Sequence, residues 1–153
     1  MSRTVEVEGD TIGYVQRISV GQHLIHSDVT VQEGGEDFGP DPHDLVLAAL
    51  GACTSMTVQM YARRKGWPLE RVHVELLWTS FAANDSVNFD NKSALVNGIE
   101  LTLSFSGDLS EEQTNRLVEI AARCPIHRLL QSPTPIRTRL AQDYKPEFAT
   151  TVP

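Results

Sequence analysis

The sequence predicts an α+β protein, because segments with the alternation of β-strands are interspersed with two clearly bounded helices. Residues 2–8 and 11–19 alternate polar and β-prone side chains around a Gly-Asp pair, which is typical of a hairpin. Residues 72–80 and 98–106 alternate in the same way after the first helix. This mixed order of strands and helices favours an α+β fold over a purely helical or purely β fold.

Three further segments complete the predicted layout. Residues 23–28 are expected to form a third strand, and residues 135–140 a final strand that closes the sheet. The polar stretch at 83–97 is expected to connect the two strands on either side of it.

Capping residues in the sequence predict both ends of the first helix. Asp41 can serve as the N-cap, Pro42 occupies the first helical position, and Asp44 stands where a capping box needs an acidic residue. Gly66 follows a run of three cations and predicts the other end. We therefore expect a helix from Pro42 to the residue before Gly66.

The first half of this helix is apolar or small on every face. Residues 45–53 contain leucine, valine, alanine and glycine and end at Cys53. A helix without a polar face is expected to be buried on all sides. The small side chains would let another helix or backbone approach Cys53 closely.

A second helix is predicted from Ser110 to Cys124. Ser110 and Gln113 form a capping-box pattern at its start. Pro125 interrupts the helix, and a short helical turn is expected to follow as far as Leu130.

Length and charge indicate one soluble domain that does not bind nucleic acid. The 153 residues fit a single domain, 1–153, in which residues 145–153 are expected to form a flexible or partner-draped tail. The 20 acidic and 13 basic residues give a net charge of −7, which disfavours a phosphate backbone as partner.

The N-terminal residues show neither a signal peptide nor a membrane anchor. Charged residues follow Met1 within the first six positions, and no apolar core of a signal sequence is present. We therefore expect a cytoplasmic protein in a reducing compartment, with no membrane partner.

Cys53 and Cys124 are the only cysteines. Two thiols far apart in the sequence can act as a nucleophile and a resolving thiol, although buried cysteines are more often simple packing residues. A metal site is not expected, because the two cysteines are not clustered and His23 and His26 fall on opposite faces of a strand.

Four motifs, in this order along the chain, resemble the OsmC/Ohr family of thiol-dependent hydroperoxide reductases, and most closely its OsmC-like branch. They are Gly39-Pro40-Asp41-Pro42-His43-Asp44-Leu45, Leu47-Ala48-Ala49-Leu50-Gly51-Ala52-Cys53-Thr54, Met60-Tyr61-Ala62 and Cys124-Pro125-Ile126-His127-Arg128.

The resemblance implies an OsmC-like fold, in which an antiparallel-rich sheet wraps around two central helices in an intertwined homodimer. It also implies reduction of organic hydroperoxides, with hydrogen peroxide as a further candidate substrate. No bound cofactor is expected. An external dithiol, of the lipoyl type in the family's hydroperoxide reductases, would restore the thiols.

By the same resemblance, Cys53 corresponds to the peroxidatic cysteine and Cys124 to the resolving cysteine. The family places an acidic residue and an arginine near the reactive thiol. Asp44 matches the acidic residue and can equally act as a helix cap. Arg17, on the second predicted strand, is the candidate arginine, and Arg128 is its rival.

His127 is a further candidate, because it follows Cys124 closely. Its ring can hydrogen-bond to Cys124 or acidify it, or it can satisfy backbone groups at the helix junction.

Two functional hypotheses other than a peroxidase remain open. The first is a dimer that senses redox state or binds a small ligand with the same thiols and turns nothing over. The second is a structural dimer whose cysteines are only packed.

Overall fold

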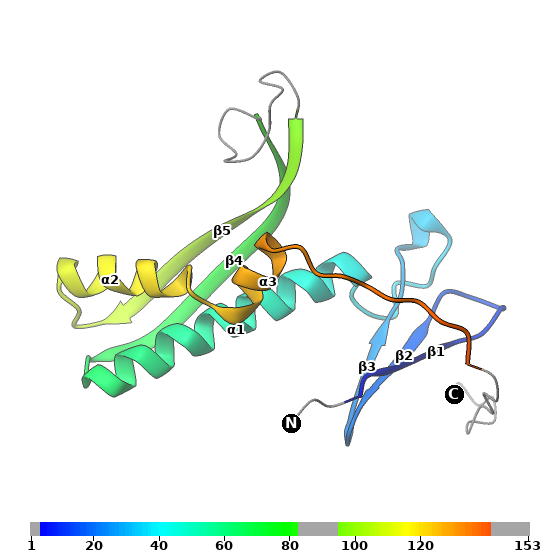
Figure 1. Cartoon of the computed structure of the whole chain (residues 1–153), viewed down its shortest axis with the longest axis horizontal. Coiled ribbons are helices and arrows are strands. Elements are labelled where there is room, and N and C mark those ends of the chain that lie inside the picture. The colour runs from blue at the N-terminus through cyan, green and yellow to red at the C-terminus, as the bar shows by residue number, and fades with distance from the viewer. Residues whose placement is uncertain (1–3, 83–94, 142–153) are drawn as a thin grey trace.

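The chain is an α+β protein built from two antiparallel sheets and a set of helices, as the sequence predicts (Figure 1). The computed structural model describes residues 4–82 and 95–141. Its elements, in chain order, are β1 (Glu6–Gly9), β2 (Gln16–Val20), β3 (His23–Ser27), the 3-10 turn η1 (Val31–Glu33), α1 (Pro42–Lys65), β4 (Leu69–Ala82), β5 (Leu95–Gly107), α2 (Glu111–Ala121) and α3 (Pro125–Gln131). The tail expected at 145–153, and most of the connection expected at 83–97, lie outside the described residues.

The N-terminal sheet has the order β1-β2-β3, with both pairs antiparallel. The hairpin between β1 and β2 is confirmed, but its turn is longer than a tight turn at the Gly-Asp pair. The carboxylate of Asp10 accepts the backbone N–H of Ile12 at 2.9 Å, so residues 10–15 form a wider turn. Figure 1 shows this sheet beyond the N-terminal end of α1, away from β4 and β5.

The ends of α1 are those that the sequence predicts. The Asp41 carboxylate accepts the N–H groups of His43 at 2.6 Å and Asp44 at 2.9 Å. The Asp44 carboxylate accepts the N–H of Asp41 at 3.4 Å, which completes the capping box. Gly66 ends the helix with a φ of 66°, a left-handed conformation that glycine adopts without strain.

The long ribbon of β4 and β5 packs one face against α1, and α2 packs beside α1 in the same core. The predicted apolar face of β5 is confirmed, since its inward side chains are half-buried. Gly51 lies where a Cβ atom would come within 2.8 Å of Leu76 on β4, so its lack of a side chain lets helix and strand approach. The buried cluster at the far end of α1 consists of Val58, Ala62, Leu117 and Ala121, and Trp67 packs against it.

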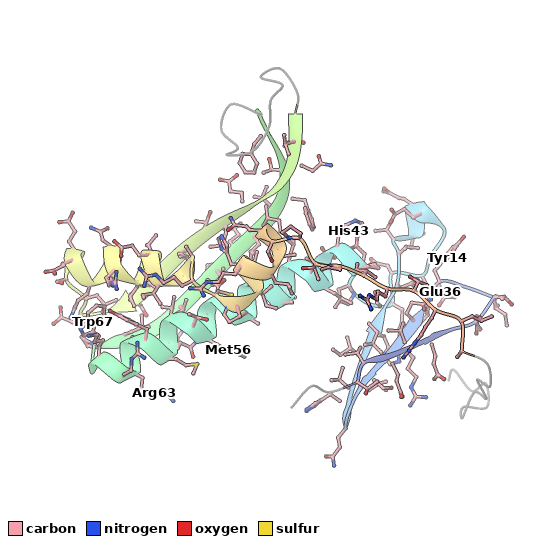
Figure 2. All side chains as sticks on the ribbon, in the orientation of Figure 1. Tyr14, Glu36, His43, Met56, Arg63 and Trp67 are labelled. Carbon is pink, nitrogen blue, oxygen red and sulfur yellow. The ribbon has the colours of Figure 1, made fainter. Side chains whose placement is uncertain are left out.

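The first half of α1 is not buried on all sides within one chain. Between residues 45 and 53, the structure buries Leu50 and Gly51, whereas Ala49 and Ala52 are exposed. Further along, Met56 keeps 60 % of its surface exposed and Met60 keeps 71 %. Figure 2 shows Met56 pointing away from the strands and from α2. The β4–β5 ribbon is too narrow to surround the helix, so residues 4–82 and 95–141 leave one side of α1 uncovered.

The prediction of a final strand at 135–140 is wrong for the single chain. Residues 133–141 form no strand, and the side chains of Ile136 and Leu140 are 88 % and 93 % exposed. Pro133 and Pro135 cannot donate backbone hydrogen bonds, and the segment leaves α3 toward the N-terminal sheet without joining it (Figure 1).

A buried carboxylate organises the connection between β3 and α1. Asp28 is 2 % exposed, and it accepts the backbone N–H groups of Val29 at 2.8 Å, Glu36 at 2.9 Å and Phe38 at 3.2 Å. Burial opposes ionisation of this carboxyl, but the N–H donors outweigh burial and lower its pKa. The carboxylate therefore holds the loop in a closed form just before α1 begins.

We expect Asp28→Asn to destabilise the protein, since an amide accepts these N–H groups less strongly and one of its two ends donates. Because the pKa of Asp28 is lower in the folded state, its contribution is complete above the unfolded pKa of about 3.9 and disappears as the pH falls through the lower folded value. Thermal unfolding followed from pH 3 to 7, in steps of about one unit, measures both effects. The variant should unfold at lower temperature near neutral pH and lose part of the acid dependence. Equal stability of both proteins throughout this range would contradict the role assigned to Asp28.

Candidate active site

The two cysteines, 71 positions apart in the sequence, meet where α3 lies across the middle of α1 (Figure 1). Cys53 comes from α1, and Cys124 is the residue just before α3. The Cys53 thiol lies within hydrogen-bonding reach of the Cys124 sulfur. Both cysteines are free thiols. The fold of one chain therefore brings the two thiols close enough to interact electrostatically, and their roles stay a prediction.

The break between α2 and α3 fixes the position of Cys124. The helix α2 ends at Ala121, and the N–H of Cys124 donates to the Ala121 carbonyl at 3.2 Å. Pro125 then starts α3, as the sequence predicts, and the carbonyl of Cys124 accepts the N–H of Arg128 at 3.1 Å. This junction leaves the Cys124 side chain 0 % exposed, against α1.

The surroundings of Cys124 favour its thiolate. Burial raises the pKa of the Cys124 thiol, but hydrogen-bond donors around the sulfur outweigh burial and lower the pKa below its ordinary value. The strongest of these donors is the thiol of Cys53. The backbone N–H groups of His127 and Ile126 and the hydroxyl of Thr54 act in the same direction.

The pKa of the Cys53 thiol is shifted in the opposite direction. Burial raises the pKa of the Cys53 thiol, and its hydrogen bond to Cys124 raises it further, since the thiol donates and a negative charge on Cys124 disfavours a second one. The N–H of Ile126 and the hydroxyl of Thr57 offset part of this increase. The two thiols therefore titrate as a coupled pair, in which a negative charge on one sulfur disfavours a negative charge on the other.

The two cysteines differ in access to solvent. Cys53 is half-buried, whereas Cys124 is completely buried. A small molecule that approaches α1 from outside therefore meets Cys53 first. The more acidic thiol and the more accessible thiol are two different residues.

Asp44 and Arg17 do not approach the cysteines within the single chain. Asp44 lies nine residues before Cys53 on the same helix, which corresponds to about 13 Å along the axis. Its carboxylate takes part in the cap of α1, and it lines an open hollow of ≈ 580 Å³ that contains neither cysteine. Arg17 lies on β2, opposite Glu8 and His26 of the neighbouring strands.

The residues after Cys124 act mainly through their backbone. His127 contributes its backbone N–H to the surroundings of the Cys124 sulfur, whereas the role considered for its ring stays a prediction. Arg128 contributes the N–H that bonds the Cys124 carbonyl, and its side chain is exposed.

Three neighbours of the sulfurs were not singled out from the sequence: Thr54, Thr57 and Ile126. The two threonines could have been noticed because they stand one and four positions after Cys53, within reach of the same helical turn. The contribution of Ile126 comes from its backbone, which no residue type reveals. Among residues 4–82 and 95–141, no group of three His, Cys, Asp or Glu side chains is placed to hold a metal ion.

A model of the family described as OsmC-like protein matches residues 33–139, which contain both cysteines. Solved structures of similar fold include an OsmC-like protein from Mycoplasma pneumoniae, with 18% identity and a TM-score of 0.66, covering 86% of this chain and 88% of the other. An organic hydroperoxide resistance protein from Legionella pneumophila has 19% identity and a TM-score of 0.62, with 86% and 90% covered. The organic hydroperoxide resistance protein OhrB of Bacillus subtilis has 18% identity and a TM-score of 0.57, with 86% and 91% covered. No curated protein sequence matches significantly.

The coupled titration of the two thiols leads to a prediction. The first thiolate of the wild type should form below the ordinary pKa of cysteine, about 8.5, because the pKa of Cys124 is lowered. Cys124→Ser should remove this early titration and leave a thiol that ionises above the ordinary value, since burial raises the pKa of Cys53. Ultraviolet absorbance of the thiolate as a function of pH measures both.

Cys53→Ser is the matched control, because its hydroxyl still donates to Cys124. This variant should keep the early titration. The opposite pattern, with early titration lost in Cys53→Ser and kept in Cys124→Ser, would show that Cys53 carries the first charge.

Proposed function

This chain belongs to the family of OsmC-like proteins, and from that membership we propose that it is a thiol-dependent peroxidase that reduces organic hydroperoxides. The observation that carries the proposal is the contact between two free thiols, one accessible and one buried. Such a pair suits a reaction in which one sulfur is oxidised and the other resolves it. The names of the Legionella and Bacillus proteins of similar fold, which refer to hydroperoxide resistance, support the same substrate class.

In the proposed first step, Cys53 attacks the peroxide. The Cys53 thiol passes its proton to the Cys124 thiolate, and the Cys53 sulfur bonds to the terminal oxygen of the hydroperoxide. The oxygen–oxygen bond breaks, and the alkoxide takes the proton back from Cys124 and leaves as an alcohol. Cys53 becomes a sulfenic acid, and Cys124 is a thiolate again.

In the proposed second step, Cys124 resolves the sulfenic acid. Its thiolate attacks the Cys53 sulfur, a disulfide forms, and the hydroxide that leaves takes a proton from solvent to become water. The electrostatic interaction between the two thiols, which requires them to be near each other, supports this step.

Recycling requires an external reductant. An external dithiol, of the lipoyl type by the family resemblance, would attack the disulfide, pass through a mixed disulfide and leave as its own disulfide, which returns both cysteines to thiols. No cofactor bound to the chain takes part in this cycle. A reducing compartment such as the cytoplasm suits it.

We expect Cys53→Ser to abolish dithiol-dependent consumption of an organic hydroperoxide, while the fold is kept. Cys124→Ser should consume about one equivalent of peroxide and then stop, because its sulfenic acid has no neighbouring thiol. The assay measures the loss of tert-butyl hydroperoxide and of longer-chain hydroperoxides with lipoamide-type dithiols and with monothiols.

A wild type that consumed no peroxide with any of these dithiols would rule out the peroxidase. If it formed the disulfide without turnover, a redox-sensing protein would replace the enzyme as the explanation. Circular dichroism of each variant shows whether lost activity reflects lost fold.

A homodimer is the second part of the proposal. The exposed side of α1 carries Ala49, Ala52, Met56 and Met60, which recur at the spacing of one helix face. A second copy that covers this face would bury the apolar surface that one chain leaves open. The second copy would also lie against α1 near Cys53. Charged residues of that copy, such as the partner's Asp44 or the partner's Arg17, could then reach Cys53.

The apolar composition of α1 is compatible with another environment. By length and composition alone it could cross a membrane, and only 22% of its most apolar window is buried in the single chain. However, its other side packs against β4 and α2, and Cys53 is in contact with Cys124. A helix already held in a folded core is more simply covered by a second core helix than by lipid.

Met60→Glu should therefore prevent dimer formation, because a carboxylate would be placed in an apolar interface. Asn115→Glu, which adds the same charge to the exposed polar side of α2, is the matched control. Light scattering during size-exclusion chromatography should show a dimer for the wild type and the control, and a monomer for Met60→Glu. A monomeric wild type would contradict the dimer but not the peroxidase chemistry.

A further inference from the structure

Both methionines in the described part of the chain lie on the surface of α1, outside the core. Met56 keeps 60 % of its surface exposed, and Met60 keeps 71 %. Methionine usually fills gaps in a core, because its side chain is flexible and apolar. The buried cluster around Val58 and Leu117 includes neither of them. Two thioether sulfurs are therefore open to small molecules in the single chain.

The two methionines continue the stripe of α1 that contains Cys53. Ala49, Cys53, Met56 and Met60 are separated by four, three and four positions. This spacing keeps side chains on one face of a helix, and it is the spacing at which two helices pack side by side. Met56 lies about 4.5 Å and Met60 about 10.5 Å beyond Cys53 along the helix axis. A hydroperoxide that approaches Cys53 from outside therefore encounters both thioethers on the same face.

A hydroperoxide can oxidise these sulfurs as well as a thiol. The thioether attacks the terminal oxygen of the hydroperoxide, a sulfur–oxygen bond forms, and the oxygen–oxygen bond breaks. The proton of the terminal oxygen moves to the departing alkoxide, which leaves as an alcohol. The sulfur loses two electrons and becomes a sulfoxide, while the hydroperoxide is reduced. The step needs no other reactant.

A sulfoxide changes the character of this face of α1. Ala49 and Ala52 offer only methyl groups, so Met56 and Met60 are the largest exposed apolar side chains of the stripe. A thioether is apolar, whereas a sulfoxide is polar and disrupts interfaces that contain methionine. A polar group that is buried without a hydrogen-bond partner is costly. Oxidation would therefore turn a surface suited to a second helix into one that favours water.

We propose that Met56 and Met60 are oxidation sites through which excess organic hydroperoxide separates the two copies of the dimer. The inference rests on the proposed function, both for the second copy that covers the stripe and for the hydroperoxide. The dimer covers the thioethers, so oxygen transfer takes place on the dissociated chain, where they are exposed. A chain that carries sulfoxides then no longer forms the apolar interface. Cys53 consumes peroxide while dithiol lasts, and the methionines are oxidised when peroxide outlasts the dithiol.

The test treats dilute wild type with tert-butyl hydroperoxide in the absence of a dithiol. Dithiothreitol is then added, because it reduces the cysteine disulfide and leaves sulfoxides in place. Mass spectrometry of proteolytic peptides should show one added oxygen at Met56 and one at Met60. Both sulfurs should be oxidised more slowly in concentrated protein, since the dimer covers them.

The same samples report on assembly. Light scattering during size-exclusion chromatography should show a dimer before oxidation and a monomer after it. The dissociation constant of the dimer should rise by about tenfold or more for each sulfoxide that the interface would have to bury. Methionine sulfoxide reductases should restore the dimer, because they return the sulfoxides to thioethers.

The double variant Met56→Leu/Met60→Leu is the matched control, because leucine is similar in volume and apolar character but has no sulfur. This variant keeps Met1 and both cysteines. It should be a dimer before and after the same treatment. Met60→Gln, which places an amide at the same position, should be a monomer without any peroxide.

A wild type that stays dimeric with both methionines oxidised would overturn the proposal. Dissociation of the double variant under the same treatment would also overturn it, because another group would then be responsible. Failure of the proposed function is visible separately. A wild type that is monomeric before oxidation contradicts the dimer and this inference with it, whereas a wild type that consumes no hydroperoxide with a dithiol contradicts the peroxidase alone.

Discussion

The contact between Cys53 and Cys124 depends on how closely other elements can approach α1. Gly51 lets β4 approach α1 closely, because a Cβ atom at this position would overlap with Leu76. The break between α2 and α3 lies against the middle of the same helix. That break holds a cysteine in a completely buried position. The sulfur pair is thus a product of helix packing, and the acidity of one of its members follows from the donors that this packing collects.

Features set by neighbouring residues were predictable from the sequence. The caps of α1 and α2, and the position of Pro125 at the start of α3, depend on side chains within three or four positions of the backbone groups that they satisfy. The same holds for the alternation of β4 and β5. Local chemistry decides these elements, so one sequence was enough to predict them.

Features that need a distant partner were predicted incompletely. The stretch 135–140 has the composition of a strand, but a strand forms only where it pairs with a sheet edge, and within the described residues this stretch pairs with none. The helix at 45–53 was expected to be covered on all sides, but the part of the chain that the structure describes covers one side. In the site, the two cysteines were identified by resemblance, whereas the backbone N–H groups beside Cys124 depend on how α3 begins. The buried role of Asp28 was not predicted, because two of the N–H groups that donate to its carboxylate lie eight and ten positions away.

The closed loop between β3 and α1 has a consequence for how this chain can vary. The Ser27 hydroxyl and the N–H of Asp28 both donate to the carbonyl of Pro40, at 2.8 and 3.4 Å, so the two ends of a 13-residue excursion meet. A loop whose ends are joined in this way resembles an Ω-loop, and the entropy of closing it changes slowly with its length. Residues could be gained or lost at the exposed tip around η1 without moving the start of α1. Length variation among related chains should therefore concentrate at this tip, while the spacing between Asp41 and Cys53 stays constant.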